Sequence, residues 1–145
     1  LQVVADFLEI NKMRFQDKLN FSIHLEDESL IYTKVPKMAL QIHVENALKH
    51  GLSKKNGHGF VSVYAKKDAD YLYLMVEDDG IGRERAGLLK RPSTRQGYKM
   101  LQSVFERLNS LNKLKITQRI TDLKNENGDA AGTRIEIWIP LNLKD

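Results

Sequence analysis

Four polar side chains with chemical potential lie close together in a predicted helix over residues 36–51. Residues four apart stack on one helix surface, so Glu45 lies beside Lys49 and Asn46 beside His50. The Asn46 carbonyl oxygen is a hard ligand suited to Mg²⁺, and Glu45 could act as a base or hold a water. The spacing alone fits a solvated helix face with an ordinary Glu–Lys pair even more readily.

A second group of residues, Glu-Asp-Asp-Gly-Ile-Gly at 77–82, directly follows a predicted strand. Asp78 at the strand end could pair with an amine donor, while Gly80 and Gly82 would let a planar ligand approach the backbone. An acidic turn fits the same residues equally well, because Asp and Gly are common turn formers.

Two further motifs contain glycine. Gly97 precedes a predicted helix over 99–112, and the free N–H groups at a helix start form an anion site. The same glycine could simply free the chain to enter the helix. Gly132-Thr133 lies between a predicted hairpin turn and the last predicted strand, and this pair alone predicts no chemistry.

Hydrophobic periodicity predicts the elements that must position these residues. Apolar residues at a helical period indicate an N-terminal helix, and strict alternation over 21–25 indicates a half-buried strand. Pro36 is expected to open the next helix, whose apolar stripe includes Leu40, Val44 and Ala47, and Gly51 is expected to end it.

The second half of the sequence predicts two hairpins and a helix. Strands over 61–66 and 71–78 form the first hairpin, and a long loop over 78–97 follows. The helix over 99–112 is expected to bury Leu101, Val104, Phe105, Leu108 and Leu111. Strands over 115–123 and 133–141 then pair around a turn at Asn127-Gly128, since both residues tolerate positive φ. The predicted fold is an α+β two-layer sandwich, a mostly antiparallel mixed sheet covered by helices on one face.

Composition narrows the functional classes. The chain has 145 residues, no cysteine and a formal net charge of +4, so disulfides and thiolate metal sites are excluded. No apolar run approaches the roughly 20 residues that span a bilayer. The lysines are dispersed, and no basic stripe interleaved with aromatic residues occurs in the sequence, so nucleic acid is not expected as a partner.

Taken in order, these motifs resemble the nucleotide-binding domain (the Bergerat fold of the GHKL superfamily) of sensor histidine kinases, type II topoisomerases and MutL-like ATPases. Residues 35–51 are similar to the N box, most closely that of autolysin-regulator sensor kinases. Residues 78–82 and 97–101 resemble the two glycine boxes, and 131–140 the closing Gly-Thr motif. The resemblance covers nearly the whole chain and includes the Arg14-Phe15 pair.

The resemblance implies a function and roles for individual residues. It implies Mg-ATP as cofactor, with Glu45 as catalytic base or water-positioning carboxylate, Asn46 as Mg²⁺ ligand, and Asp78 as acceptor of the adenine amino group. Residues 83–96 would form a lid over the phosphates. Further nucleotide-binding residues implied by the match are Lys49, His50, Gly80, Gly82, Arg95, Gly97, Tyr98, Gly132 and Thr133.

Two departures from the family pattern bear on activity. Asp79 stands where the family usually has Asn, which adds a negative charge near the nucleotide. The lid keeps only Gly97 before its helix, with Ser93 and Arg95 at positions where glycines are usual. These departures favour an alternative, a degenerate nucleotide-binding module without kinase activity, whereas the intact Glu45 and Asn46 oppose it. Another ATPase of the superfamily, such as an anti-sigma-factor serine kinase or a topoisomerase fragment, is a third reading.

The resemblance also implies partners and a division into parts. Residues 1–19 are expected to be a helix leading from a phospho-acceptor segment of a longer protein, and residues 20–145 the ATP-binding domain. Expected partners are a helical phospho-acceptor domain, a response regulator and a second copy of the full-length protein. A cytoplasmic domain of a protein anchored in the inner membrane is expected. No histidine lies in the phospho-acceptor context, so this chain is expected to bind ATP without phosphorylating itself.

Overall fold

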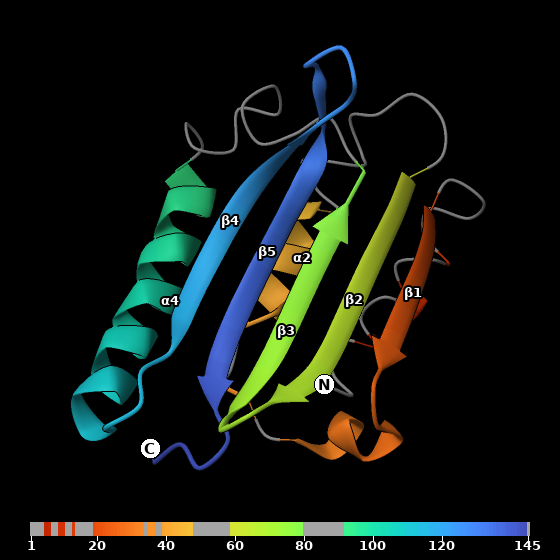
Figure 1. The fold of residues 1–145 in the computed structure, drawn as a ribbon. Coiled ribbons are helices and arrows are strands. Elements are labelled where there is room, and N and C mark those ends of the chain that lie inside the picture. The colour runs from red at the N-terminus through yellow and green to blue at the C-terminus, as the bar shows by residue number, and fades with distance from the viewer. Residues whose placement is uncertain are drawn as a thin grey trace.

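A five-stranded sheet dominates the structure (Figure 1). The computed structural model describes residues 5–6, 9–10, 13, 19–33, 35–36, 39–47, 59–79 and 92–144. Its elements in chain order are β1 (Leu19–Leu25), the 3₁₀ helix η2 (Glu28–Tyr32), α2 (Gln41–Asn46), β2 (Gly59–Asp68), β3 (Tyr71–Asp78), α4 (Pro92–Leu111), β4 (Thr117–Lys124) and β5 (Ala130–Pro140). The backbone is also helical at the described positions before β1, which are Ala5, Asp6, Glu9, Ile10 and Met13.

The strands lie in the order β1-β2-β3-β5-β4. β1 pairs with β2 in parallel, and the other three pairings are antiparallel. The last strand in the chain therefore lies inside the sheet, between β3 and β4. This mixed, mostly antiparallel sheet confirms the predicted fold class.

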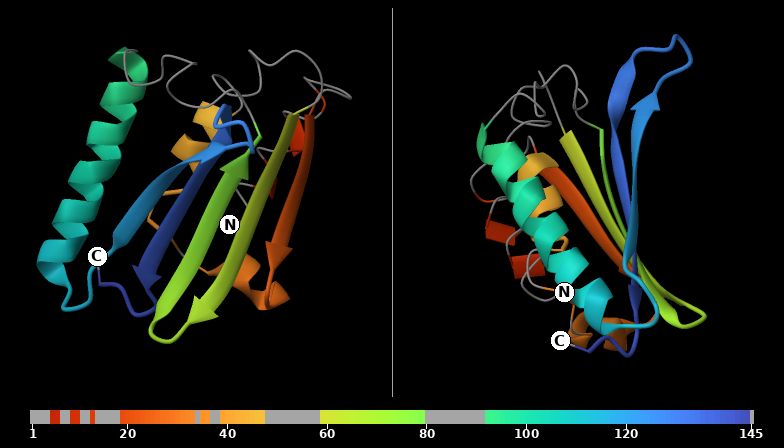
Figure 2. Two further views of the ribbon diagram at one scale, coloured as in Figure 1. Left: turned by 45° about the horizontal axis from the view of Figure 1, so that its top comes forward. Right: turned by 90° about the vertical axis from the view of Figure 1, so that its left-hand side faces the viewer.

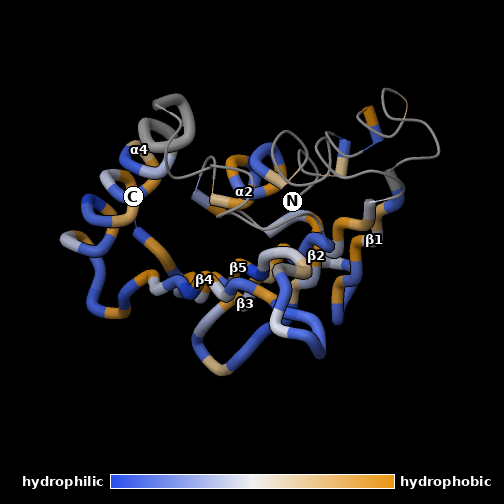
Figure 3. Tube along the Cα trace, turned by 90° about the horizontal axis from the view of Figure 1, so that it is seen from above, coloured by the Kyte–Doolittle hydropathy of each residue, from blue (hydrophilic) through white to orange (hydrophobic). Residues whose placement is uncertain are grey.

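Helices α2 and α4 cover one face of the sheet, which gives two layers (Figure 2). Figure 3 views these layers from one end of the molecule. Strand residues alternate between the two faces, so every second side chain of β2 and β3 enters the core. Among the described residues, nineteen apolar side chains form the core between the layers. They include Val61, Val63, Leu72, Leu74, Val76, Ile135, Ile137 and Ile139 from the sheet and Ile42, Val44, Leu101, Phe105 and Leu108 from the helices. Each large aliphatic side chain buried here stabilises the fold by about 1.5–3 kcal/mol.

Helix α2 begins later than its sequence predicts. Pro36 does not open the helix, because its carbonyl accepts the Ala39 N–H at 3.0 Å and forms a separate turn. The first helical bond is donated by the Val44 N–H to the Leu40 carbonyl, so the helix starts at Gln41. The predicted apolar stripe is confirmed, since Leu40, Val44 and Ala47 are buried. The expected end at Gly51 lies outside the described residues.

Helix α4 begins earlier than expected, at Pro92, where proline's fixed φ and missing N–H suit a first helical turn. The predicted helix over 99–112 is therefore its second part. Leu101, Phe105 and Leu108 are buried as predicted. The prediction was wrong for Val104 and Leu111, which are 37% and 52% exposed because they lie outside the stripe formed by Leu101, Phe105 and Leu108.

Both predicted hairpins form. Between β2 and β3, Ala69 adopts a left-handed conformation with φ of 54°. Between β4 and β5, Asn125 accepts N–H bonds from Asn127 and Asp129 through its Oδ1. The predicted turn at Asn127-Gly128 is confirmed, and of these two residues Gly128 adopts a positive φ, 81°. The turn is a three-residue loop closed by Asn125 and Asp129, in which one left-handed residue suffices.

A polar and aromatic network covers the sheet face opposite the helices. The Tyr73 hydroxyl donates to Glu136 Oε2 at 2.6 Å, and Arg119 donates to Glu136 Oε1 at 2.8 Å. Burial raises the pKa of Glu136, but the bonds from Tyr73 and Arg119 outweigh it and leave that pKa lowered. Burial and the Glu136 bond raise the pKa of Tyr73 to about 12. Trp138 packs beside Tyr73, so β3, β4 and β5 are linked on this face.

Candidate functional site

The buried carboxylate Asp78 ends β3. It continues the inward alternation of Leu72, Leu74 and Val76, so its side chain lies on the helix-covered face of the sheet and is only 8% exposed. Its register partner on β5 is Thr133, which is 7% exposed. A buried carboxylate is costly unless polar groups satisfy it, so this position suits recognition of a polar ligand by an acceptor.

Gly132 allows β5 to pack against the end of β3. Its φ is 130°, a conformation that residues with side chains rarely adopt. A Cβ at this position would lie 1.9 Å from the carbonyl oxygen of Asp78 and 3.0 Å from Cα of Asp79. Glycine is therefore required here, and the Gly132-Thr133 pair, which alone predicted no chemistry, holds the Asp78 backbone in place.

Asp79 closes the end of the β2–β3 pair. Its Oδ1 accepts the Phe60 N–H at 2.7 Å, and its own N–H donates to the Phe60 carbonyl at 3.2 Å. The sequence predicted extra negative charge near a nucleotide from this residue. One oxygen of the carboxylate is instead engaged by the neighbouring strand.

Helix α2 carries the second pair of candidate residues at its C-terminal end. Glu45 is partly buried and accepts a bond from Gln41 Nε2 at 3.2 Å, which orients its carboxylate along the helix. Asn46 is buried, and its Nδ2 has no hydrogen-bond partner within the described ranges. A half-turn of this amide would offer Oδ1 instead, so the side chain fits a Mg²⁺ ion held jointly with phosphates.

The fold brings these groups to one end of the molecule. The C-terminal ends of α2 and β3 lie at the same end, with α2 on the sheet face toward which Asp78 points (Figures 1 and 2). Gly132 and Thr133 lie beside Asp78 through the β3–β5 pairing. Residues from three distant parts of the sequence thus lie at the same end of the molecule.

The second glycine box differs from its expected structure. Gly97 lies inside α4, as the sixth residue of the helix that begins at Pro92. It therefore does not provide a free helix start for an anion. Residues 92–96, expected in the lid loop, are helical as well, and Arg95 is among them. Because the backbone after Pro92 is helical, these positions do not require the additional conformations that glycine allows. The remaining lid residues, together with Lys49, His50, Gly80 and Gly82, lie outside the described residues.

Sequence reasoning missed His43. It is 3% exposed, and neither ring nitrogen has a hydrogen-bond partner among the residues that the structure describes. Burial lowers its pKa to about 4. Its ring contacts that of Tyr98 on α4, with centroids 6.0 Å apart. The available signal was its position between Ile42 and Val44 in an apolar stretch, where a histidine is unusual.

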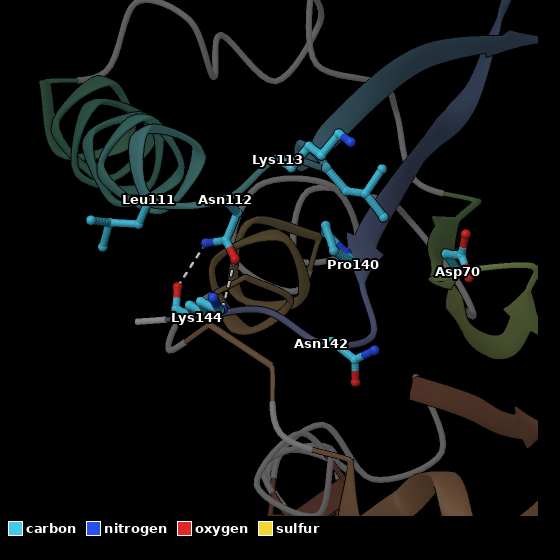
Figure 4. Close-up of a pocket in the computed structure, with 8 residues that line it drawn as sticks. Asp70, Leu111, Asn112, Lys113, Pro140, Asn142 and Lys144 are labelled. Atoms are coloured by element: carbon cyan, nitrogen blue, oxygen red, sulfur yellow. Dashed lines mark hydrogen bonds between the residues drawn. The ribbon is translucent and has the colours of Figure 1, made fainter.

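A hollow of about 280 Å³ lies at the opposite end of the molecule (Figure 4). Its walls come from the β2–β3 turn, the end of α4 and the C-terminal segment, and they include Asp70, Asn112, Pro140, Asn142 and Lys144. Asn112 bonds both the N–H and the carbonyl of Lys144 and so fixes that segment. The hollow contains none of the residues expected to bind nucleotide.

Among the described helices, none is long and apolar enough to cross a membrane.

Solved structures share this architecture. The histidine kinase AdeS of Acinetobacter baumannii superposes with a TM-score of 0.61 at 20% sequence identity, covering 97% of this chain and 64% of that one. At this level of identity the likeness establishes the shared fold alone.

Sequence relatives lead to the family. Sensor histidine kinase BtsS of Escherichia coli K12 is 37% identical over 79 residues, which are 54% of this chain and 14% of that protein. Sensor protein LytS of Staphylococcus haemolyticus is 34% identical over 82 residues, 57% of this chain and 14% of that protein. The family of histidine kinase-, DNA gyrase B- and HSP90-like ATPases matches residues 34–143, and the chain belongs to it. This confirms the resemblance seen in the motifs.

Proposed function

We propose that this chain is the ATP-binding catalytic domain of a two-component sensor histidine kinase. It would transfer the γ-phosphoryl group of Mg-ATP to a histidine on a separate helical domain. The observation that carries the proposal is the buried Asp78 beside Thr133, held by the close approach of Gly132, at the end of the molecule where α2 presents Glu45 and Asn46. The sensor-kinase relatives support the choice of a histidine kinase within the family.

At the adenine end, Asp78 accepts the exocyclic amino group and Thr133 supports the same edge. A carboxylate offers only acceptors, so the pair distinguishes an amino-bearing purine from one with a carbonyl at that position. A base with a carbonyl at that position would place an acceptor against the buried Asp78 carboxylate and could not donate the hydrogen bond. Gly80 and Gly82 let the ring seat against the backbone.

At the phosphate end, Asn46 holds the metal and Glu45 orients or deprotonates the attacking group. Bound Mg²⁺ supplies charge neutralisation for the phosphates. Lys49, His50, Arg95 and Tyr98 complete this end of the site in the proposal. Gln41 holds the Glu45 carboxylate by the bond already described, which keeps it oriented before ligand arrives.

The proposed partners are the phospho-acceptor helical domain of the full-length protein, a response regulator, and a second copy of that protein. The chain spans 14% of the length of BtsS and of LytS, so these partners belong to the whole protein and are proposed with it. We place the domain in the cytoplasm, as part of a membrane-anchored sensor. The 145-residue chain alone binds ATP without phosphorylating itself, and incorporation of labelled phosphate into it would contradict this.

The test is Mg-ATP titration of the wild type beside Asp78→Asn and Asn46→Asp by calorimetry. Asp78→Asn is expected to weaken ATP binding about 10- to 100-fold, because a charge-assisted hydrogen bond of roughly 1.5–3 kcal/mol is lost. Asn46→Asp is expected to change the Mg²⁺ concentration needed for binding.

Matched controls come from the opposite end of the molecule. Asp70→Asn and Asn142→Asp make the same chemical changes at the exposed hollow and are expected to leave the ATP affinity unchanged. If both site variants bind ATP like the wild type, the assignment of the site is wrong. If the wild type binds no ATP, the proposed function is wrong.

A further inference from the structure

His43 occupies a position that stability alone would not select. It lies in the buried stripe of α2, where its neighbours Ile42 and Val44 are apolar. Both ring nitrogens, Nδ1 and Nε2, are buried and have no hydrogen-bond partner in the described part of the chain. Native proteins leave few buried polar atoms unsatisfied, and each such atom costs free energy, so a group like this calls for an explanation.

The surroundings of His43 connect two parts of the proposed site. Asn46, the proposed metal ligand, is three residues further along α2 and therefore on the same flank of the helix. Its Nδ2 is also buried without a partner. On the other side, the His43 ring contacts Tyr98 of α4, the helix that follows the expected lid. The His43 imidazole thus lies between α2, which carries the proposed metal ligand, and α4, which follows the expected lid.

We propose that His43 is a positioning residue that couples α2 to α4, and that it gains its hydrogen-bond partner only in the arrangement of the two helices that binds Mg-nucleotide. The inference rests on the proposed function and deepens it. Burial keeps the imidazole neutral, so one nitrogen donates and the other accepts. Without nucleotide, the missing hydrogen bond of the His43 ring costs free energy. Nucleotide binding removes this cost, which favours the bound arrangement of the two helices.

The mechanism predicts opposite effects on stability and on affinity. Leucine has a similar size and no polar atoms, so His43→Leu is expected to raise the Tm of the nucleotide-free protein by about 2–4 °C. The same variant is expected to bind Mg-ADP about 5- to 10-fold more weakly, since one hydrogen bond gained on binding is lost. A residue with only a structural role would not separate the two measurements.

Two further variants sharpen the comparison. His43→Gln keeps a donor and an acceptor and is expected to restore Mg-ADP affinity to within about threefold of the wild type. Ile42→Val, next to His43 in the core, removes one buried methylene group and is expected to lower Tm without changing affinity. Together they distinguish the polar function of His43 from general packing of α2.

The experiment combines thermal unfolding, Mg-ADP titration and ¹⁵N NMR of the histidine ring. Addition of Mg-ADP to the wild type is expected to shift the His43 ring nitrogen resonances, a readout that does not depend on whether a variant folds. Unchanged resonances, or equal Mg-ADP affinity of His43→Leu and wild type, would overturn the inference while leaving the proposed function intact. If the wild type fails to bind Mg-ADP, the proposed function and this inference both fail.

Discussion

Gly132 offers the sharpest test at the scale of single residues. Gly132→Ala is expected to destabilise the fold by at least about 2 kcal/mol, because the added Cβ would collide with the Asp78 carbonyl and the φ of 130° is strained for alanine. ATP affinity should fall as well, since the end of β3 must move. Urea unfolding and ATP titration measure the two effects.

The control for this substitution is Gly128→Ala at the tip of the β4–β5 hairpin. Gly128 also has a positive φ, 81°, but a Cβ there would meet nothing within 4 Å. It is expected to cost roughly 1–2 kcal/mol for the backbone conformation and to leave ATP affinity unchanged. Equal effects of the two substitutions would show that the close approach at Gly132 does not position Asp78.

The motifs predicted which residues form the candidate site but not what surrounds them, and the roles of these residues stay a prediction. Asp78, Asn46 and Thr133 were identified from motif order, and the structure describes all three as buried. The close packing of Gly132 could not be predicted, because it depends on which strand lies beside β3. The exposure of a histidine such as His43 is likewise set by the packing of two helices distant in sequence.

Among the elements, α4 contacts the core through a single stripe. Phe105→Ala is expected to lower the free energy of unfolding by about 3–5 kcal/mol, because Phe105 is buried in the core. Val104→Ala, at the adjacent and more exposed position, should cost under about 1 kcal/mol. Similar losses for the two in urea unfolding would contradict the described orientation of α4.

Strands were easier to predict than helix starts. Alternation of apolar and polar residues indicated the strands at 21–25 and 61–66, because one face of this sheet is covered and the other is not. The last two strands were located from the turn at Asn127-Gly128 between them. The start of α2 was wrong because the Pro36 carbonyl forms its own turn with Ala39. The start of α4 was wrong because glycine and charge between 78 and 97 obscured the helix beginning at Pro92.

For the molecule as a whole, the pH dependence of folding depends on His43. Its folded pKa of about 4 lies below the ordinary 6.5, so the unfolded chain binds a proton first as the pH falls. The folded state is therefore expected to lose roughly 3 kcal/mol of stability between pH 6.5 and pH 4. Denaturant unfolding at a series of pH values measures this loss.

His43→Leu should remove most of this acid dependence. Glu136 retains its own contribution, because its pKa is lowered in the folded state. The ionised carboxylate stabilises the fold at pH values above the ordinary pKa of Glu, and this stabilisation is lost as the pH falls. A wild type whose stability is flat from pH 7 to pH 4.5 would contradict the burial of a neutral imidazole.

At alkaline pH the raised pKa of Tyr73 acts in the opposite sense, and stability should fall as the pH rises from 10 toward 12.

The position of β5 has a consequence for how this domain is made. A chain that emerges from the ribosome in order would present β3 with one hydrogen-bonding edge unoccupied until residues 130–140 follow, because β5 lies between β3 and β4. During that interval Asp78 has no neighbouring Thr133, and the bare edge can pair with other chains. Nascent chains halted before residue 130 should therefore depend on chaperones and lack the ability to hold a nucleotide.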